Sequence, residues 1–154
     1  MTRLVDLKLE GRQVQQHRPW HRTIVNSAMW NAAVAQLAEG HLVLLGLWAE
    51  PDAMHMALFD EGINDIGIIS LDCVEGHYPS VGQRHAPALR LERAIHDLFG
   101  LHATGLPDTR PWLDHGRWNL RHPLGAGTVT SPSFPDYEFL SAEGESLHQI
   151  AVGP

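Results

Sequence analysis

The sequence predicts an α+β domain: an antiparallel sheet of three to four strands, two helices on one face of that sheet, and a proline-rich extended arm at the C-terminal end. Three observations support this prediction. Three apolar runs follow one another between short turns, at 41–48, 53–59 and 64–71. A segment with helical periodicity precedes these runs, and another follows them. From Leu101 onward, prolines and glycines interrupt every regular pattern.

The N-terminal third contains one clear helix and two weak strand signals. Residues 2–9 alternate loosely between apolar and polar, and residues 23–25 are β-branched, so each segment predicts a short strand. Ser27 is a candidate N-cap, and apolar residues then recur at helical spacing as far as Gly40. This pattern predicts a helix over 27–39.

The three apolar runs predict a meander of antiparallel strands. The turn signals between them, Glu-Pro-Asp at 50–52 and Asp-Glu-Gly at 60–62, are too short for the crossover that parallel strands need. The helix predicted over 86–99 starts near Pro87 and ends at Gly100. The residues expected in the core are Leu42, Leu44, Leu45, Leu58, Ile66, Ile68, Ile95 and Leu98.

Composition excludes several classes of protein. With 154 residues, the chain is long enough for one compact domain with a hydrophobic core. Its net charge of −7 argues against a general nucleic-acid binder. A single cysteine, Cys73, excludes an internal disulfide framework and a cluster held by four cysteines of this chain. No apolar run could span a bilayer and no secretory leader is visible, so we expect a cytosolic protein.

Charge is unevenly distributed along the chain. Residues 77–123 carry a net charge of +2, whereas the segments before and after them carry −5 and −4. On the second predicted helix, Glu92 and His96, and likewise Arg93 and Asp97, lie four residues apart. The basic middle segment is therefore the candidate working surface.

Signals for catalysis are weak. The sequence has no G-x-S-x-G elbow, and Gly125-Ala126-Gly127 does not open a helix, so neither a serine nucleophile nor a phosphate loop is predicted. Eleven histidines leave a metal-dependent enzyme as the alternative, although none of their spacings is typical of zinc. The residues of that alternative site are His85, His96, Asp97, Asp114 and His115.

The stretches 78–101, 107–118 and 122–124 resemble the 30-kDa subunit family of respiratory NADH:quinone oxidoreductase (complex I). That family has a helix with Glu-Arg-Glu-x-x-Asp-x-x-Gly, then His-Pro-Asp-x-Arg, then Gly-His-Pro-Leu. The matching residues here are Glu92, Arg93, Asp97, Gly100, Pro107, Asp108, Arg110, His122, Pro123 and Leu124. The chain departs from the pattern at Ala94, Leu106, Arg121 and 125–127.

The chain resembles one group of proteins more closely: the large subunits of formate-hydrogenlyase-type membrane-bound [NiFe]-hydrogenases. The N-terminal domain of those large subunits is itself similar to the 30-kDa subunit. Residues 143–154 are similar to the first strands of the 49-kDa subunit or hydrogenase large-subunit fold. We therefore expect an α+β domain of the 30-kDa type over 1–100, a docking arm over 101–136, and the start of a large-subunit domain over 137–154. The resemblance implies that the chain is the N-terminal portion of a longer polypeptide.

The resemblance also implies a function. Such a subunit is a scaffold without cofactors that packs on the catalytic large subunit, beside a small iron–sulfur subunit, at the inner face of the cell membrane. It serves catalysis only within the complex, whose electron donor stays open between NADH, formate and ferredoxin. The residues expected to carry docking are Glu92, Arg93, Asp97, Gly100, Pro107, Asp108, Arg110, Trp112, Asp114, Arg117, Trp118, His122 and Pro123.

Two alternatives stay open within that set. The charges of Glu92, Arg93 and Asp97 either form a buried network with Asp108, Arg110, Asp114 and Arg117 of the arm, or merely solvate an exposed helix face. For Trp112 and Trp118, the expected role is hydrophobic anchoring of the arm.

Overall fold

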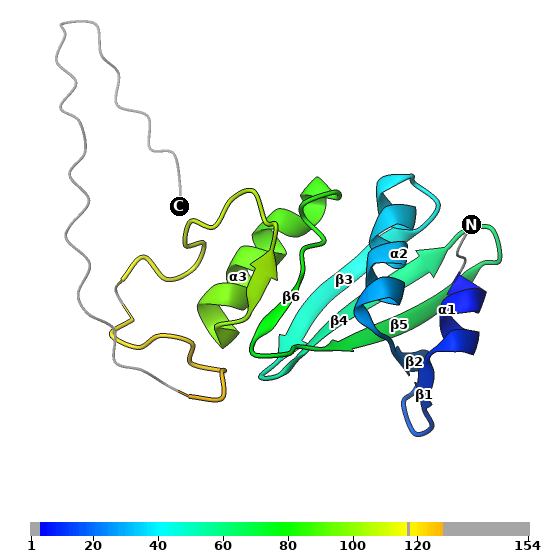
Figure 1. Ribbon diagram of the computed structural model, residues 1–154, viewed down its shortest axis with the longest axis horizontal. Coiled ribbons are helices and arrows are strands. Elements are labelled where there is room, and N and C mark those ends of the chain that lie inside the picture. Colours follow the sequence, from blue (N-terminus) through cyan, green and yellow to red (C-terminus); the bar gives the residue numbers. More distant parts are fainter. Residues whose placement is uncertain (1–3, 117, 128–154) are drawn as a thin grey trace, which may run out of the picture.

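The computed structural model describes residues 4–116 and 118–127. Figure 1 shows a sheet with helices over one face and, at the left-hand end, the segment that follows the last helix. The elements are α1 (Leu4–Glu10), β1 (Arg12–Val14), β2 (His21–Ile24), α2 (Ser27–Ala38), β3 (Val43–Glu50), β4 (Ala53–Asp60), β5 (Asp65–Asp72), β6 (His77–Pro79), a 3-10 turn (Ala86–Ala88), α3 (Leu89–Phe99) and β7 (His102–Thr104).

The predicted meander is confirmed. Strands β3, β4 and β5 pair antiparallel, with Met56 of β4 opposite both Leu47 and Ile69. The sheet is larger than predicted, because β2 adds to β5 and β1 adds to β2, giving the order β1-β2-β5-β4-β3. The β2–β5 pair is parallel, which the long intervening chain through α2 allows.

One face of the sheet carries the main core. Met54, Met56 and Leu58 are fully buried there, in the same cluster as Trp30 of α2 and Ile95 of α3. The two predicted helices therefore share a face, as expected for this α+β fold. In the described part of the chain, no helix combines the length and apolar composition needed to cross a membrane.

The N-terminal strand prediction is wrong. Residues 4–10 form α1, and Leu4 is fully buried in the core beneath it. Leu4 and Leu7 are three residues apart, as on one face of a helix, whereas Leu7 and Leu9 are two apart, as in a strand, so seven residues do not separate the two patterns. The expected N-cap also shifts by one residue, because the Asn26 side chain accepts the hydrogen bond from the Met29 N–H at 2.9 Å.

Half of the predicted core residues are buried as expected. Leu42, Leu58, Ile68 and Ile95 are buried, whereas Leu44, Ile66 and Leu98 are only partly buried. The prediction that Leu45 lies in the core is wrong, since this residue is 52% exposed. The register between β3 and β4 shifts at this position, and β3 is an edge strand, so the bulge leaves Leu45 on the surface.

The segment after α3 is held against the domain from its first residues. Gly100 ends α3 with a left-handed φ of 77°, and β7 then pairs in parallel with β6. From residue 105 to 127 the described chain has no further strand or helix, as the prolines and glycines predict. We refer to the described residues after α3, 101–116 and 118–127, as the arm.

Candidate functional site

Glu92 lies on the inner side of α3 and is fully buried. Its carboxylate accepts hydrogen bonds from the backbone N–H groups of Val81 and Gly82 and from the Ser80 hydroxyl, each at 2.8 Å. Burial raises the pKa of Glu92, whereas these hydrogen bonds lower it. For Glu92 neither open alternative holds, because its carboxylate is buried and fixes the loop that leads into α3, not the arm.

Gly82 has to be glycine for this contact. A Cβ at Gly82 would lie 2.7 Å from Oε2 of Glu92 and 3.1 Å from side-chain carbons of Leu89 and Leu106. Tyr78 is buried beside this carboxylate, and burial together with the Glu92 charge raises the pKa of its hydroxyl. Sequence reasoning missed this loop, because only the folded chain brings residues 80–82 next to Glu92.

Asp97, further along α3, holds the middle of the arm. Its Oδ2 accepts the backbone N–H groups of Trp112 at 2.7 Å and Leu113 at 2.6 Å, with Asp114 at 3.4 Å. Asp97 is 8% exposed, so these hydrogen bonds are shielded from water. A carboxylate that collects several backbone N–H groups fixes a turn of the chain without any regular secondary structure.

Arg93 supports the arm just before that turn. Its guanidinium donates to the carbonyls of Arg110 at 2.6 Å and Pro111 at 2.9 Å, and to Oδ2 of Asp108 at 3.0 Å. The Arg93 side chain is 12% exposed. Arg93 therefore pairs with Asp108 as the buried network predicts, whereas Asp97 is buried against backbone N–H groups of the arm, and the solvated helix face is wrong for both.

Arg110 was also expected in the buried network, but it lies on the surface. It donates through Nε and Nη2 to the Asp108 carboxylate at 2.9 and 2.7 Å, which lowers the pKa of Asp108. The Arg110 side chain is nevertheless 80% exposed, so its ion pair is a surface contact. The prediction of a buried Arg110 pair is wrong, because the arm turns this side chain outward.

The end of the described arm packs over the C-terminal end of α3. The Leu124 N–H donates to the Leu98 carbonyl at 2.9 Å, and the His122 ring lies against Gly100, where a Cβ would come within 3.0 Å of it. Asp114, also buried, accepts the Gly116 N–H at 2.8 Å. Asp114 and His122 are thus brought next to Asp97 and Gly100 of α3.

The two tryptophans are not buried anchors. Trp112 is 37% exposed and Trp118 is 41% exposed. The guanidinium carbons of Arg90 and Arg93 lie 4.9 and 5.2 Å from the Trp112 ring centroid. Sequence reasoning missed Arg90, which no motif indicated.

The remaining predicted residues are less informative. Pro107 is exposed and Pro123 is partly buried. Arg117, the last part of the predicted arm (128–136) and the predicted large-subunit segment (137–154) lie outside the described residues.

Four histidines cluster where the arm meets β6 and α3. His77 stacks on His102 with centroids 5.2 Å apart, His96 lies 4.7 Å from His102, and His122 lies 5.4 Å from His96. Burial and the neighbouring imidazoles lower the pKa of His102. Within the described ranges, no three His, Cys, Asp or Glu side chains are arranged to hold a metal, so the five residues of the alternative enzyme site do not form one.

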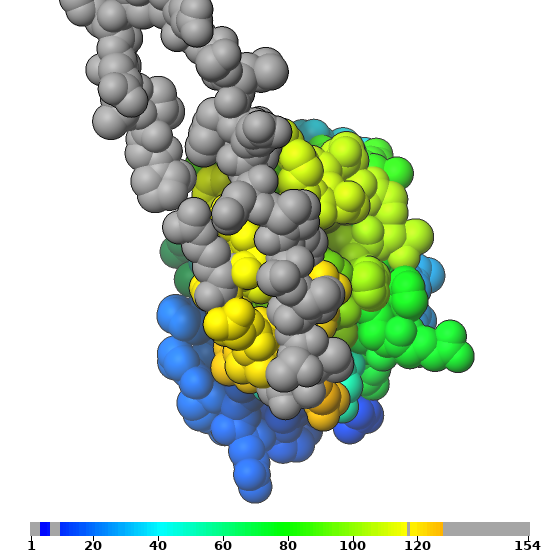
Figure 2. Space-filling model, turned by 90° about the vertical axis from the view of Figure 1, so that its left-hand side faces the viewer, coloured from blue at the N-terminus to red at the C-terminus, as the bar shows by residue number. Residues whose placement is uncertain are grey.

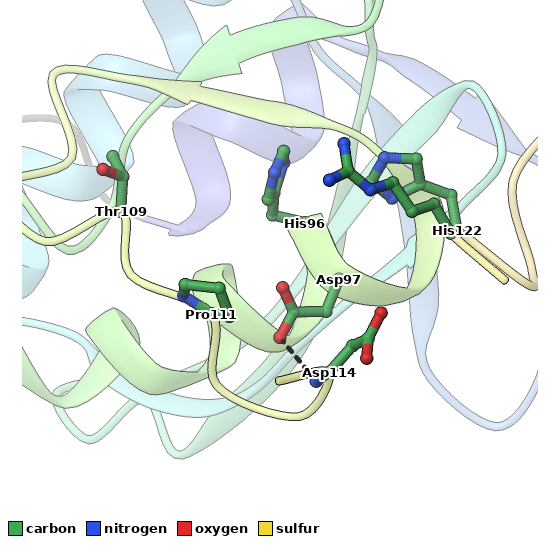
Figure 3. Close-up of a pocket in the computed structure, with 7 residues that line it drawn as sticks. His96, Asp97, Thr109, Pro111, Asp114 and His122 are labelled. Atoms are coloured by element: carbon green, nitrogen blue, oxygen red, sulfur yellow. Dashed lines mark hydrogen bonds between the residues drawn. The ribbon is translucent and has the colours of Figure 1, made fainter. Parts of the chain in front are cut away.

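A small pocket of about 140 Å³ lies between α3 and the arm. Figure 3 shows Asp97 and Asp114 next to each other in this pocket, with the Asp114 N–H bonded to Asp97 and with His96 and His122 nearby. Cys73 does not line this pocket, and burial raises the pKa of its thiol to about 11, which keeps it protonated at neutral pH. The pocket thus results from the attachment of the arm to α3.

Residues 54–131, half of the chain, match the family described as "Respiratory-chain NADH dehydrogenase, 30 Kd subunit". The chain belongs to this family. The matched range includes all thirteen residues that the resemblance singled out, from Glu92 to Pro123. As a 30-kDa-type subunit, the chain is related to a component of a respiratory oxidoreductase complex, which assembles from several subunits.

A solved structure shows the same fold. It is the trypsin-resistant fragment (1-134) of Nqo5 in P63 form, which is similar with a TM-score of 0.55 and 18% sequence identity. The similarity covers 68% of this chain and 95% of that chain. No curated protein sequence is similar enough to this chain to match.

Proposed function

We propose that this 30-kDa-type chain is an accessory module that carries no cofactor and docks on the catalytic large subunit of a membrane-associated oxidoreductase through the arm and α3. The large subunit is of the 49-kDa type, with a small iron–sulfur subunit beside it, at the inner face of the membrane. The complex is either an NADH:quinone oxidoreductase or a formate-hydrogenlyase-type hydrogenase. The isolated module takes no part in the chemistry.

One observation supports docking above all others: the arm is fixed to the domain by its backbone. Arg93 and Asp97 bind backbone carbonyl and N–H groups of residues 110–114, and the Trp112 and Leu113 side chains of this segment face outward. Figure 2 shows the yellow and orange residues of the arm on the surface at this end of the molecule. A segment ordered before binding loses less conformational entropy on association.

The outward side chains are of the kind that protein interfaces bury. Trp118 is 41% exposed and Leu124 is 53% exposed, with Trp112 and Leu113 close to 40%. Exposed aromatic and apolar side chains next to an arginine are typical of interface centres. The arm therefore offers an ordered, apolar and arginine-bearing surface to a partner subunit.

Replacing Trp118 and Leu124 together by serine is expected to weaken assembly with the large subunit at least tenfold, since truncating central interface residues typically costs about 2 kcal/mol or more. Both side chains are exposed, so the domain should unfold at the unchanged temperature. Assembly is measured by co-purification of the separately expressed chain and large subunit. The matched control replaces Val43 and Leu45, exposed at the start of the edge strand β3, by serine. Equal loss in both variants would contradict docking through the arm.

A further inference from the structure

A groove of about 600 Å³ lies between the N-terminal half of α3 and the arm around residues 108–112. It shares Trp112 with the docking surface, but neither Trp118 nor Leu124 lines it. It is lined by Ala86, Pro87, Leu89, Arg90, Arg93, Asp108, Arg110 and Trp112.

The groove has more arginine than carboxylate. Arg93 and Arg110 share the single carboxylate of Asp108. Arg90 has no carboxylate partner among the residues that the structure describes, and it lies over Trp112 instead. The groove thus contains three guanidinium groups and one carboxylate, which leaves it with a surplus of positive charge in a chain whose net charge is −7.

The guanidinium groups are held in place and not merely exposed. Arg93 is fixed by the carbonyls of Arg110 and Pro111, and Arg110 by a two-point contact with Asp108. Arg90 is positioned by its contact with the indole of Trp112, 4.9 Å from the ring centroid. Fixed, planar guanidinium groups suit bidentate recognition of carboxylates.

Trp112 supplies the apolar part of the groove. Trp112 is 37% exposed although Arg90 and Arg93 both lie over its ring. A ligand that follows the groove therefore meets cations with an exposed indole surface between them. This combination favours a chain that carries both carboxylates and an apolar side chain.

We propose that the groove binds an extended acidic segment of a partner protein, with carboxylates on Arg90 and Arg110 and an apolar side chain on Trp112. The proposal rests on the docking function proposed above and specifies the chemistry of the partner. A nucleic acid has the wrong chemistry, because the chain around this local basic groove is acidic overall and repels a long polyanion. A short acidic peptide experiences mainly the local charge.

The test uses a fluorescent peptide of about ten residues with glutamates around one leucine, and a matched peptide with glutamine in place of each glutamate. Fluorescence anisotropy at low salt is expected to show the acidic peptide binding about tenfold more tightly than the glutamine peptide, and about 0.5 M salt is expected to remove the difference. The double variant Arg90→Gln, Arg110→Gln is expected to bind the acidic peptide about tenfold more weakly, at an unchanged unfolding temperature. Arg12→Gln, on β1 at the opposite end of the molecule (Figure 1), is expected to bind as the parent does.

Three results would overturn the proposal. Equal binding of the two peptides, or equal weakening by Arg12→Gln, would show that the groove does not recognise carboxylates. Tight peptide binding that appears only after Asp136, Glu138, Glu143 and Glu145 are replaced by amides would show that the chain's own acidic segment is the ligand. Because the peptide assay needs no large subunit, its failure with normal co-purification removes the groove proposal and leaves the docking proposal standing.

Discussion

Glu92→Ala is expected to lower the free energy of unfolding by about 3 kcal/mol. The substitution leaves the N–H groups of Val81 and Gly82 and the Ser80 hydroxyl without their acceptor, in a place that water does not reach. Each buried donor left unpaired costs about 1–3 kcal/mol, and relaxation of the loop recovers part of the total. Urea unfolding followed by circular dichroism measures the loss.

Two further variants separate hydrogen bonding from other causes. Glu92→Gln keeps the size of the side chain but turns an NH₂ group toward one of the donors, so it is expected to lose about 1–2 kcal/mol. Glu61→Ala removes an exposed carboxylate from a turn and is expected to change stability by less than about 0.5 kcal/mol. If Glu92→Ala is as stable as Glu61→Ala, the carboxylate does not hold the loop.

Asp97→Ala is expected to free the arm while the sheet stays folded. Oδ2 of Asp97 is the acceptor for the N–H groups of Trp112 and Leu113, and hydrogen bonds to a charged group contribute about 1.5–3 kcal/mol each. We expect a loss of about 2 kcal/mol, together with at least tenfold faster proteolytic cleavage within residues 105–116. Limited proteolysis with mass spectrometry locates the cuts.

Asp97→Asn provides the matched control. The amide keeps a neutral oxygen that can accept the same N–H groups, so cleavage is expected to be intermediate between the parent and Asp97→Ala. Cleavage in Asp97→Ala that is no faster than in the parent would mean that Arg93 and the packing of residues 122–125 hold the arm without Asp97.

The sequence was sufficient for the features set by local pattern. Runs of apolar residues with short turns between them predicted β3, β4 and β5, and Pro87 and Gly100 marked the beginning and end of the second helical segment. Features that depend on tertiary pairing could not be predicted. The parallel pairing of β2 with β5 is one of them, and the bulge that exposes Leu45 is another.

The same distinction holds for the candidate site. The resemblance pointed to Glu92, Arg93 and Asp97, but the i,i+4 spacing on a helix does not say what each side chain binds. All three side chains bind backbone groups, of residues 81–82 for Glu92 and of residues 110–114 for the other two. Backbone partners leave no charge pattern in a sequence. Arg90 was missed for a related reason, since its partner is an aromatic ring twenty-two residues away.

Hydrogen exchange of the chain, alone and assembled with the large subunit, tests the docking account most directly. The account predicts that assembly slows exchange in residues 105–124 and leaves β3 and β4 unchanged. The outer face of the sheet is the competing surface, because Val43, Leu45 and Trp48 are each about 40–50% exposed there. Slower exchange confined to β3, with the arm unchanged, would contradict the account and place the partner on the sheet.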